Sequence, residues 1–280
     1  MRNKSARAFT LVELLVVIAI IGVMVAMAIP AVQASREMGR RAICQANLGQ
    51  IMLAVQNYEN AFESLPAGVV NPDGPIKNEP VGLHQGWLIQ MLPYLDAQAA
   101  YRLVDLSKSV YDPANARVRE LSLPVLICPS EPKDDRAKSN YAGCHHDVEA
   151  PIAADNQGVL FLNSGIREHD IPDGASFTIF AGEKLVDPGD LGWMSGTRAT
   201  LRNTGLPPNA PATVIAADGL GTAPALLYVG GFASAHVGGA FVGFGDASVR
   251  FMAEDIDPVL WQRLGNRADG NLVDVTPGAE

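Results

Sequence analysis

An apolar run near the start of the chain constrains its fold more than any other feature. The run extends from Phe9 to Ile29 and contains a single charged side chain, Glu13. As a helix, this run would be about 31 Å long, which is close to the ~30 Å thickness of the hydrocarbon core of a bilayer. We therefore predict one transmembrane helix over residues 9–29, preceded by a short basic segment.

Glu13 is the exception within this run. A charged side chain at membrane depth costs a few kcal/mol and normally marks a function or has a dedicated partner. The alternative is an ordinary secretory signal peptide cut after the small residues of Ala26-Met27-Ala28. Against it, the apolar core is longer than that of a typical signal peptide, and a carboxylate inside such a core is unusual.

Beyond Pro30 the pattern changes from wholly apolar to amphipathic. Apolar side chains recur three or four positions apart and form one stripe of a helix. This stripe consists of Cys44, Leu48, Ile51, Val55, Tyr58 and Phe62. We predict that the helix continues over residues 30–64, packs its stripe on a globular domain, and ends before Pro66. Pro30 removes one backbone hydrogen bond and is expected to bend or loosen the helix.

The three cysteines are Cys44, Cys128 and Cys144, too few for a disulfide-stapled scaffold. The absence of a Cys-x-x-Cys pair argues against a zinc site. In an exported domain we expect one disulfide and one free thiol, and the sequence leaves all three pairings open. Cys44 heads the apolar stripe, where it is either a small buried hydrophobe or a tether to Cys128.

Residues 65–280 have the pattern of a β-rich domain. Short apolar segments alternate with loops rich in glycine and proline, which predicts a mainly antiparallel sheet and an α+β fold. A short helix interrupted at Pro93 is expected over 87–101. Gly245-Asp246 favours a type II′ turn, since glycine accepts a positive φ without steric cost. Candidate strands lie at 125–128, 158–162, 177–182, 213–217, 226–229, 240–244 and 248–252.

Charge and motif content narrow the chemistry. The net charge of −9 argues against a nucleic-acid partner. The densest group of ligand-type residues is 144–147 with Glu149, but adjacent histidines in a strand point to opposite faces. Asp255 and Asp257 alone do not define a calcium site. No phosphate-binding, dinucleotide or nucleophile-elbow motif occurs. We expect no enzymatic activity, no cofactor and no metal.

The start of the chain resembles the type IV pilin and type II secretion pseudopilin signature. The matching residues are Arg7-Ala8-Phe9-Thr10-Leu11-Val12-Glu13. In that family a basic leader is cut just before a Phe, whose new amine is N-methylated, and a Glu lies four residues beyond. The resemblance implies a leader over 1–8 and cleavage between Ala8, where the family usually has Gly, and Phe9. It also implies that Glu13 pairs with the Phe9 amine of a neighbouring subunit, and that Pro30 is a kink position.

Motifs along the rest of the chain resemble the family called domain of unknown function 1559. Members of that family begin with a prepilin-type methylation motif and end with a His-x9-Asp-Gly segment. The final motif here is His236 with Asp246, followed by Ala247 where the family has Gly; we expect His236 and Asp246 to form a structural hydrogen-bonded pair. The earlier motifs are residues 30–37, 44–48, 92–95, 128–130, and 172–176 with Gly182-Glu183. The family has no established activity, so the resemblance implies architecture and cell location.

Together these features predict a pilin-like α+β protein that is a structural (pseudopilin) subunit of a type II secretion or type IV pilus-like system. Its expected partners are a prepilin peptidase, other pilin-like subunits and the inner membrane, which it crosses once with its C-terminal domain in the periplasm. The alternative is a membrane-tethered, exported binding protein that does not polymerise. A third hypothesis is an exported enzyme that uses His236 or the pair His145-His146.

Overall fold

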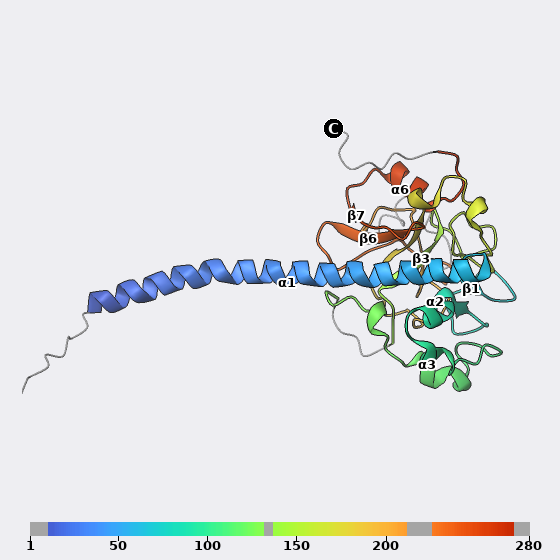
Figure 1. Ribbon diagram of the computed structural model, residues 1–280, viewed down its shortest axis with the longest axis horizontal. Coiled ribbons are helices and arrows are strands. Elements are labelled where there is room, and N and C mark those ends of the chain that lie inside the picture. Colours follow the sequence, from blue (N-terminus) through green and yellow to red (C-terminus); the bar gives the residue numbers. More distant parts are fainter. Residues whose placement is uncertain (1–10, 132–136, 212–225, 272–280) are drawn as a thin grey trace, which may run out of the picture. The chain divides into compact units, whose positions relative to one another are not determined.

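The long N-terminal helix is present in the computed structural model, which describes residues 11–131, 137–211 and 226–271. Helix α1 extends over Leu11–Phe62 and is continuous through Pro30 (Figure 1). It ends where Glu63 takes a left-handed backbone conformation, with φ of 56°, before Pro66. The chain divides into two compact units, one ending at Ala42 and the other beginning at Ile43.

The second unit is built on a five-stranded sheet with the strand order β5-β3-β4-β6-β7. Strand β3 pairs with β5 in parallel, whereas the other three pairings are antiparallel. The predicted α+β class with a mainly antiparallel sheet is therefore confirmed. The strands are β3 (Tyr141–His146), β4 (Ile179–Glu183), β5 (Leu201–Asn203), β6 (Gly239–Phe244) and β7 (Val249–Ala253), with a separate pair of β1 (Val69–Val70) and β2 (Gln85–Gly86).

Short helices fill the connections between these strands. The helix expected over 87–101 is present in three pieces, and Pro93 lies in the middle piece, as predicted. The helices are α2 (Trp87–Met91), η1 (Leu92–Tyr94), α3 (Gln98–Tyr101), η2 (Pro113–Asn115), α4 (Ala116–Arg119), η3 (Pro124–Leu126), η4 (Glu168–Asp170), η5 (Ala175–Phe177) and α6 (Pro258–Gly265).

Three of the candidate strands correspond to β4, β6 and β7, and three others are wrong. Residues 125–128 overlap η3, 226–229 form a turn and a loop, and 158–162 make only one isolated bridge. In this last segment the N–H groups of Val159 and Leu160 donate to the same carbonyl, that of Cys144. These hydrogen bonds do not form the regular ladder of a β-strand, although the side chains of residues 159–162 are buried. The candidate at 213–217 lies outside the described residues.

The C-terminal part of α1 packs on the rest of its unit as the apolar stripe predicts. Cys44, the first buried residue of α1, heads a run of fully buried side chains on this face. In Figure 1, β6 and β7 lie on one side of this part of α1, and α2 and α3 on the other. Phe62 is the exception in the stripe, because it is 59% exposed at the end of the helix, where it stacks on Tyr58 with ring centroids 4.4 Å apart.

The turn between β6 and β7 differs from the predicted type II′ turn. The residue with a positive φ is Ala247, at 62°, and Gly245 is not among the positive-φ residues. Ala247 N–H donates to Phe244 O at 2.9 Å, and Phe244 N–H donates to Ser248 O at 2.9 Å. The loop therefore has three residues with the left-handed one last. Gly245 serves close packing instead, since a Cβ there would lie 2.5 Å from Phe180 Cζ.

Candidate functional site

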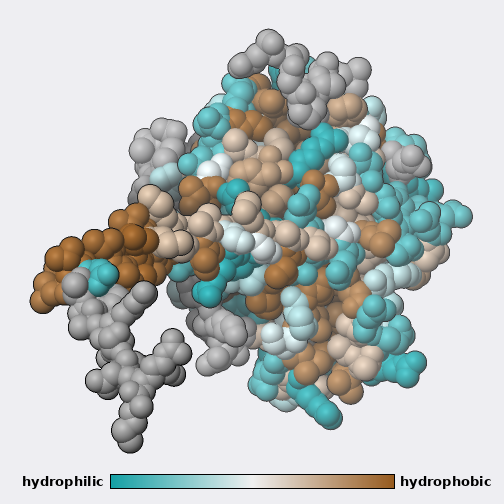
Figure 2. Space-filling model, turned by 60° about the vertical axis from the view of Figure 1, so that its left-hand side comes forward, coloured by the Kyte–Doolittle hydropathy of each residue, from teal (hydrophilic) through white to brown (hydrophobic). Residues whose placement is uncertain are grey.

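The N-terminal part of α1 exposes a long apolar surface. Its large apolar side chains between Leu11 and Ile29 are from 45% to 74% exposed. Figure 2 shows them as a hydrophobic surface, coloured brown. Among the described residues, α1 is the one helix long and apolar enough to cross a membrane. An exposed apolar surface of this size is unfavourable in water. The length and composition of this part of α1 are those of a single membrane anchor.

The residues predicted to direct processing and assembly lie at or near this segment. Glu13 is in the first turn of α1 as the structure describes it, and Pro30 lies inside the helix without breaking it. Ala8 and Phe9, the predicted cleavage and methylation residues, lie outside the described residues. Of these four residues, the structure therefore describes only Glu13 and Pro30, and both lie within α1.

A disulfide ties α1 to the domain. Cys44 is bonded to Cys128, which lies 84 positions away in the sequence, with 5.5 Å between their Cα atoms. This is the tether considered from the sequence, and it selects one of the three open pairings. Cys144 is the free cysteine and is buried, and burial raises the pKa of its thiol.

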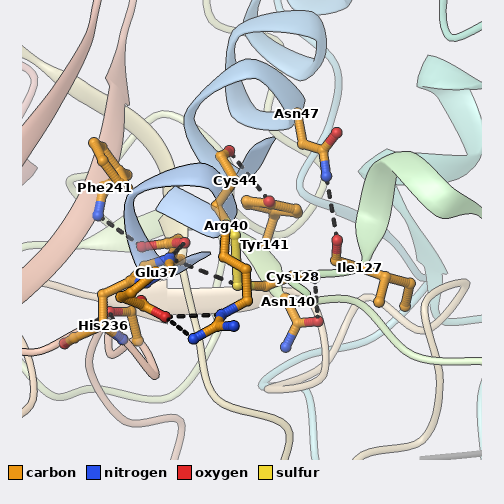
Figure 3. The surroundings of a disulfide bond; sticks show 12 residues. Glu37, Arg40, Cys44, Asn47, Ile127, Cys128, Asn140, Tyr141, His236 and Phe241 are labelled. Atoms are coloured by element: carbon orange, nitrogen blue, oxygen red, sulfur yellow. Dashed lines mark hydrogen bonds and ion pairs between the residues drawn. A yellow bond between two sulfur atoms is a disulfide. The ribbon is translucent and has the colours of Figure 1, made fainter. Parts of the chain in front are cut away.

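Hydrogen bonds hold both ends of the disulfide in place (Figure 3). The Tyr141 hydroxyl donates to the carbonyl of Cys44 at 3.2 Å, and the Cys128 N–H donates to Asn140 Oδ1 at 2.8 Å. One turn further along α1, the Asn47 amide donates to the carbonyl of Ile127 at 3.2 Å. The second half of α1 is therefore fixed to the domain by covalent and polar contacts as well as by its apolar stripe.

Two ionisable side chains lie beside the disulfide. His236 Nε2 is 3.7 Å from Cys128 Sγ and 3.3 Å from Glu183 Oε1. Glu183 is the last residue of β4, and its Oε2 accepts a hydrogen bond of 2.8 Å from the Phe241 N–H. One ligand atom from each of Cys44, Cys128, Glu183 and His236 lies within 4.8 Å of the others, and all four residues are at most 4% exposed. We call these four residues the buried centre.

His236 contacts Glu183 and not Asp246, the partner predicted from the sequence. His236 precedes β6 and Asp246 follows it, so a strand of six residues, about 20 Å long, separates them. Asp246 instead accepts a 2.9 Å bond from the Ser248 N–H within its own turn. Glu183 was not singled out as a site residue, although an acidic residue at the end of the apolar run Ile-Phe-Ala-Gly is a signal of a buried, partnered charge.

The second group of ligand-type residues forms a hydrogen-bonded framework. His145 is fully buried, and its Nδ1 lies 3.0 Å from Asn156 Oδ1. Burial lowers its pKa to about 3, so this imidazole is neutral. His146 is half-buried and contacts the Asp147 carboxylate instead. Glu149 accepts three hydrogen bonds, two of them from backbone N–H groups. The two histidines thus have different partners and do not converge on one point.

The acidic residues near the C-terminal end have a local role. Asp257 accepts a 2.8 Å hydrogen bond from the Leu260 N–H and caps α6. Asp255 is exposed in the preceding turn. A helix cap needs no cation to explain its carboxylate.

Comparison with known families covers both parts of the chain. A family model described as "Protein of unknown function (DUF1559)" matches residues 33–259, more than three quarters of the chain and all of the buried centre. A second model, described as "Prokaryotic N-terminal methylation motif", matches residues 3–29. Both resemblances found in the sequence are thereby confirmed. No curated protein and no solved structure matches the chain.

Proposed function

This chain belongs to the family described as "Protein of unknown function (DUF1559)", and from this premise we propose that it is a structural, pilin-like (pseudopilin) subunit of a type II secretion or type IV pilus-like system. Its N-terminal methylation motif makes it a prepilin-type protein. The family itself supplies no activity, so the assignment depends on the methylation motif and on the N-terminal part of α1.

The observation that carries the proposal is the exposed apolar segment with one carboxylate near its start. Residues 11–29 form nearly 30 Å of helix, and lipid or neighbouring apolar helices would cover that surface. A carboxylate at membrane depth is costly. In the proposed assembly, Glu13 pairs with the methylated amine of Phe9 on an adjacent subunit, so that two costly charges offset each other only when subunits associate.

The proposed cell location follows from the same features. A prepilin peptidase would cut between Ala8 and Phe9 on the cytoplasmic side of the inner membrane and methylate the new amine. The domain would then lie in the periplasm. The disulfide between Cys44 and Cys128 supports this side, because disulfides persist in oxidising compartments such as the periplasm.

The direct test is the intact mass and N-terminal sequence of the mature protein, purified from membranes of cells that contain a prepilin peptidase. We expect residues 1–8 to be absent and Phe9 to carry one methyl group on its amine. An unprocessed Met1, or a start at Ile29 after signal-peptide cleavage, would refute the processing route. Substitution of Ala8 by Gly, the residue usual in the family, should leave the product unchanged and speed its formation.

Assembly is tested separately with Glu13→Ala. This variant should still insert in the membrane, but cross-linking between subunits should fall to background, because the Phe9 amine loses its counter-charge. Glu63→Ala is the matched control, since Glu63 is an exposed carboxylate just after α1 and outside the apolar segment. Undiminished cross-linking of Glu13→Ala would leave a membrane-tethered binding protein as the better account.

A further inference from the structure

We propose that the buried centre is a metal site as well as a disulfide site: when the bond between Cys44 and Cys128 is reduced, the two thiolates, Glu183 and His236 bind one zinc-type divalent ion. The proposal concerns the domain alone and does not depend on how the N-terminus is processed.

The donor set is one that zinc accepts. Zinc in proteins is bound by cysteine sulfur, histidine nitrogen and carboxylate oxygen, and structural sites are four-coordinate and closed to solvent. The buried centre offers two sulfurs, one imidazole nitrogen and one carboxylate oxygen, all from buried residues. They come from α1, the segment after η3, the end of β4 and the loop before β6. An ion there would join four separate parts of the domain.

The measured separations agree with tetrahedral coordination. Zinc lies about 2.3 Å from sulfur, about 2.05 Å from histidine nitrogen and about 2.1 Å from carboxylate oxygen. A tetrahedral angle then places sulfur about 3.6 Å from nitrogen, and nitrogen about 3.4 Å from oxygen. The structure has 3.7 Å between Cys128 Sγ and His236 Nε2, and 3.3 Å between His236 Nε2 and Glu183 Oε1. These two separations already match those that a tetrahedral ion requires, and all four donor atoms lie within 4.8 Å of one another.

Glu183 supplies a second, independent observation. Glu183 is 1% exposed. Its Oε1 faces His236 but has no hydrogen-bond partner among the described residues. A buried carboxylate oxygen without a donor is uncommon and calls for an explanation. The other oxygen is held by the Phe241 N–H, as the non-ligating atom of a metal-bound carboxylate often is. A cation within the centre would bind Oε1 directly, where the structure has no hydrogen bond to it.

The disulfide and the ion exclude each other. In a tetrahedral site the two sulfurs would lie about 3.8 Å apart, whereas bonded sulfurs are about 2.05 Å apart. A dithiol reduces the cystine to two thiols by giving up two electrons and two protons, and becomes a disulfide itself. A phosphine gives up the same two electrons and becomes a phosphine oxide, and one water molecule supplies the oxygen and the two protons. Both thiols then lose their protons to solvent as zinc binds, so one zinc ion replaces two protons. The centre therefore links α1 to the domain in either redox state.

The experiment uses the full-length chain in detergent with zinc chloride as the probe. The protein is reduced with a phosphine under anaerobic conditions, loaded, desalted and analysed for metal and for free thiols. We expect about one zinc per reduced chain and almost none in the oxidised chain. Cobalt in place of zinc should give the charge-transfer absorption of a thiolate-bound, tetrahedral ion. Metal content that is the same in both redox states, or cobalt without that absorption, overturns the proposal.

Variants identify the ligands. Glu183→Gln and His236→Gln should each weaken zinc binding at least tenfold, because even outer-shell changes cost ten- to a hundredfold. Cys144→Ser and His145→Gln are matched controls, since each alters a buried residue of the same kind outside the centre, and both should bind as the wild type does. Equal affinity in the ligand variants, or an equal loss in the controls, refutes the assignment. The cobalt spectrum of the wild type decides the matter if a variant does not fold.

Discussion

The disulfide between Cys44 and Cys128 gives the most quantitative prediction. Replacing both cysteines by alanine removes a cross-link that closes a loop of 84 residues. The chain-entropy relation assigns such a loop about 15 cal/mol/K, which is about 4.6 kcal/mol at 25 °C. A domain of this size changes its Tm by about 2–4 °C per kcal/mol. We therefore expect the double variant to unfold roughly 9–18 °C below the oxidised wild type.

Thermal unfolding of the full-length chain in detergent measures this difference. Trp87, Trp193 and Trp261 are all fully buried, so their fluorescence reports the loss of the core. A chelator is included so that no metal replaces the disulfide. Adding reductant to the wild type should give the same decrease in Tm as the double substitution, and should not affect the double variant.

Cys144→Ala is the control for this experiment, because Cys144 is the remaining cysteine and is free and buried. Its Tm should still fall by the same interval on reduction. If reductant leaves the wild-type Tm within about 2 °C, less than 1 kcal/mol on this scale, then packing alone holds the helix. If the control loses its response to reductant, a different pair of cysteines is bonded.

Three further predictions concern single side chains. The pKa of His145 is about 3 in the folded state, below the ~6.5 of an unfolded histidine, so the unfolded state binds the extra proton between these values. The free energy of unfolding should therefore fall by about 1.4 kcal/mol per pH unit from pH 6.5 toward 3 through this group. Urea unfolding at pH 7 and 5 should show a weaker pH dependence in His145→Gln, and an equal one would contradict the burial of a neutral imidazole. Gly243→Ala places a Cβ 2.4 Å from Met52 Cγ, so it should cost about 1–3 kcal/mol. Adding Met52→Ala should recover part of that loss, whereas strictly additive effects would show that the two sites do not touch. Ala247→Gly should raise the free energy of unfolding by about 0.5–1 kcal/mol, because alanine at φ 62° is strained and glycine is not. A Tm equal to or below that of the wild type would refute this account of the turn.

Features set by local periodicity were predictable from the sequence. The apolar run and the stripe that begins at Cys44 are helical patterns, and each depends on spacing within a few turns. Strands β4, β6 and β7 are short runs rich in apolar residues, between turn-forming residues, and they too were found. Strand β3 was missed because its sequence, Tyr-Ala-Gly-Cys-His-His, has no β-like pattern. Its place in the sheet is set by β4 and β5 on either side.

Features set by long-range contacts were not predictable in the same way. The partner of His236 depends on which strand ends meet, and Glu183 is 53 positions away in the sequence. The four residues of the buried centre extend from position 44 to position 236, so no motif spacing indicates a metal site. The turn was misplaced because glycine can serve two purposes. Gly245 allows close packing against Phe180, and the residue with the left-handed backbone conformation is Ala247.

The position of the buried centre along α1 matters for a subunit held by its helix. Cys44 is the first buried residue of α1, and the apolar contacts of Leu48, Ile51 and Val55 all follow it in the chain. Each such side chain contributes about 1.5–3 kcal/mol by burial, but a load applied from residues 11–43 would break these contacts one at a time if nothing preceded them. A covalent bond at Cys44 receives that load first, so the apolar contacts are loaded only after it breaks. A zinc ion bound to Cys44 would stand at the same place when the disulfide is reduced. The centre therefore resists detachment of the helix at a position that precedes Leu48, Ile51 and Val55 in the chain.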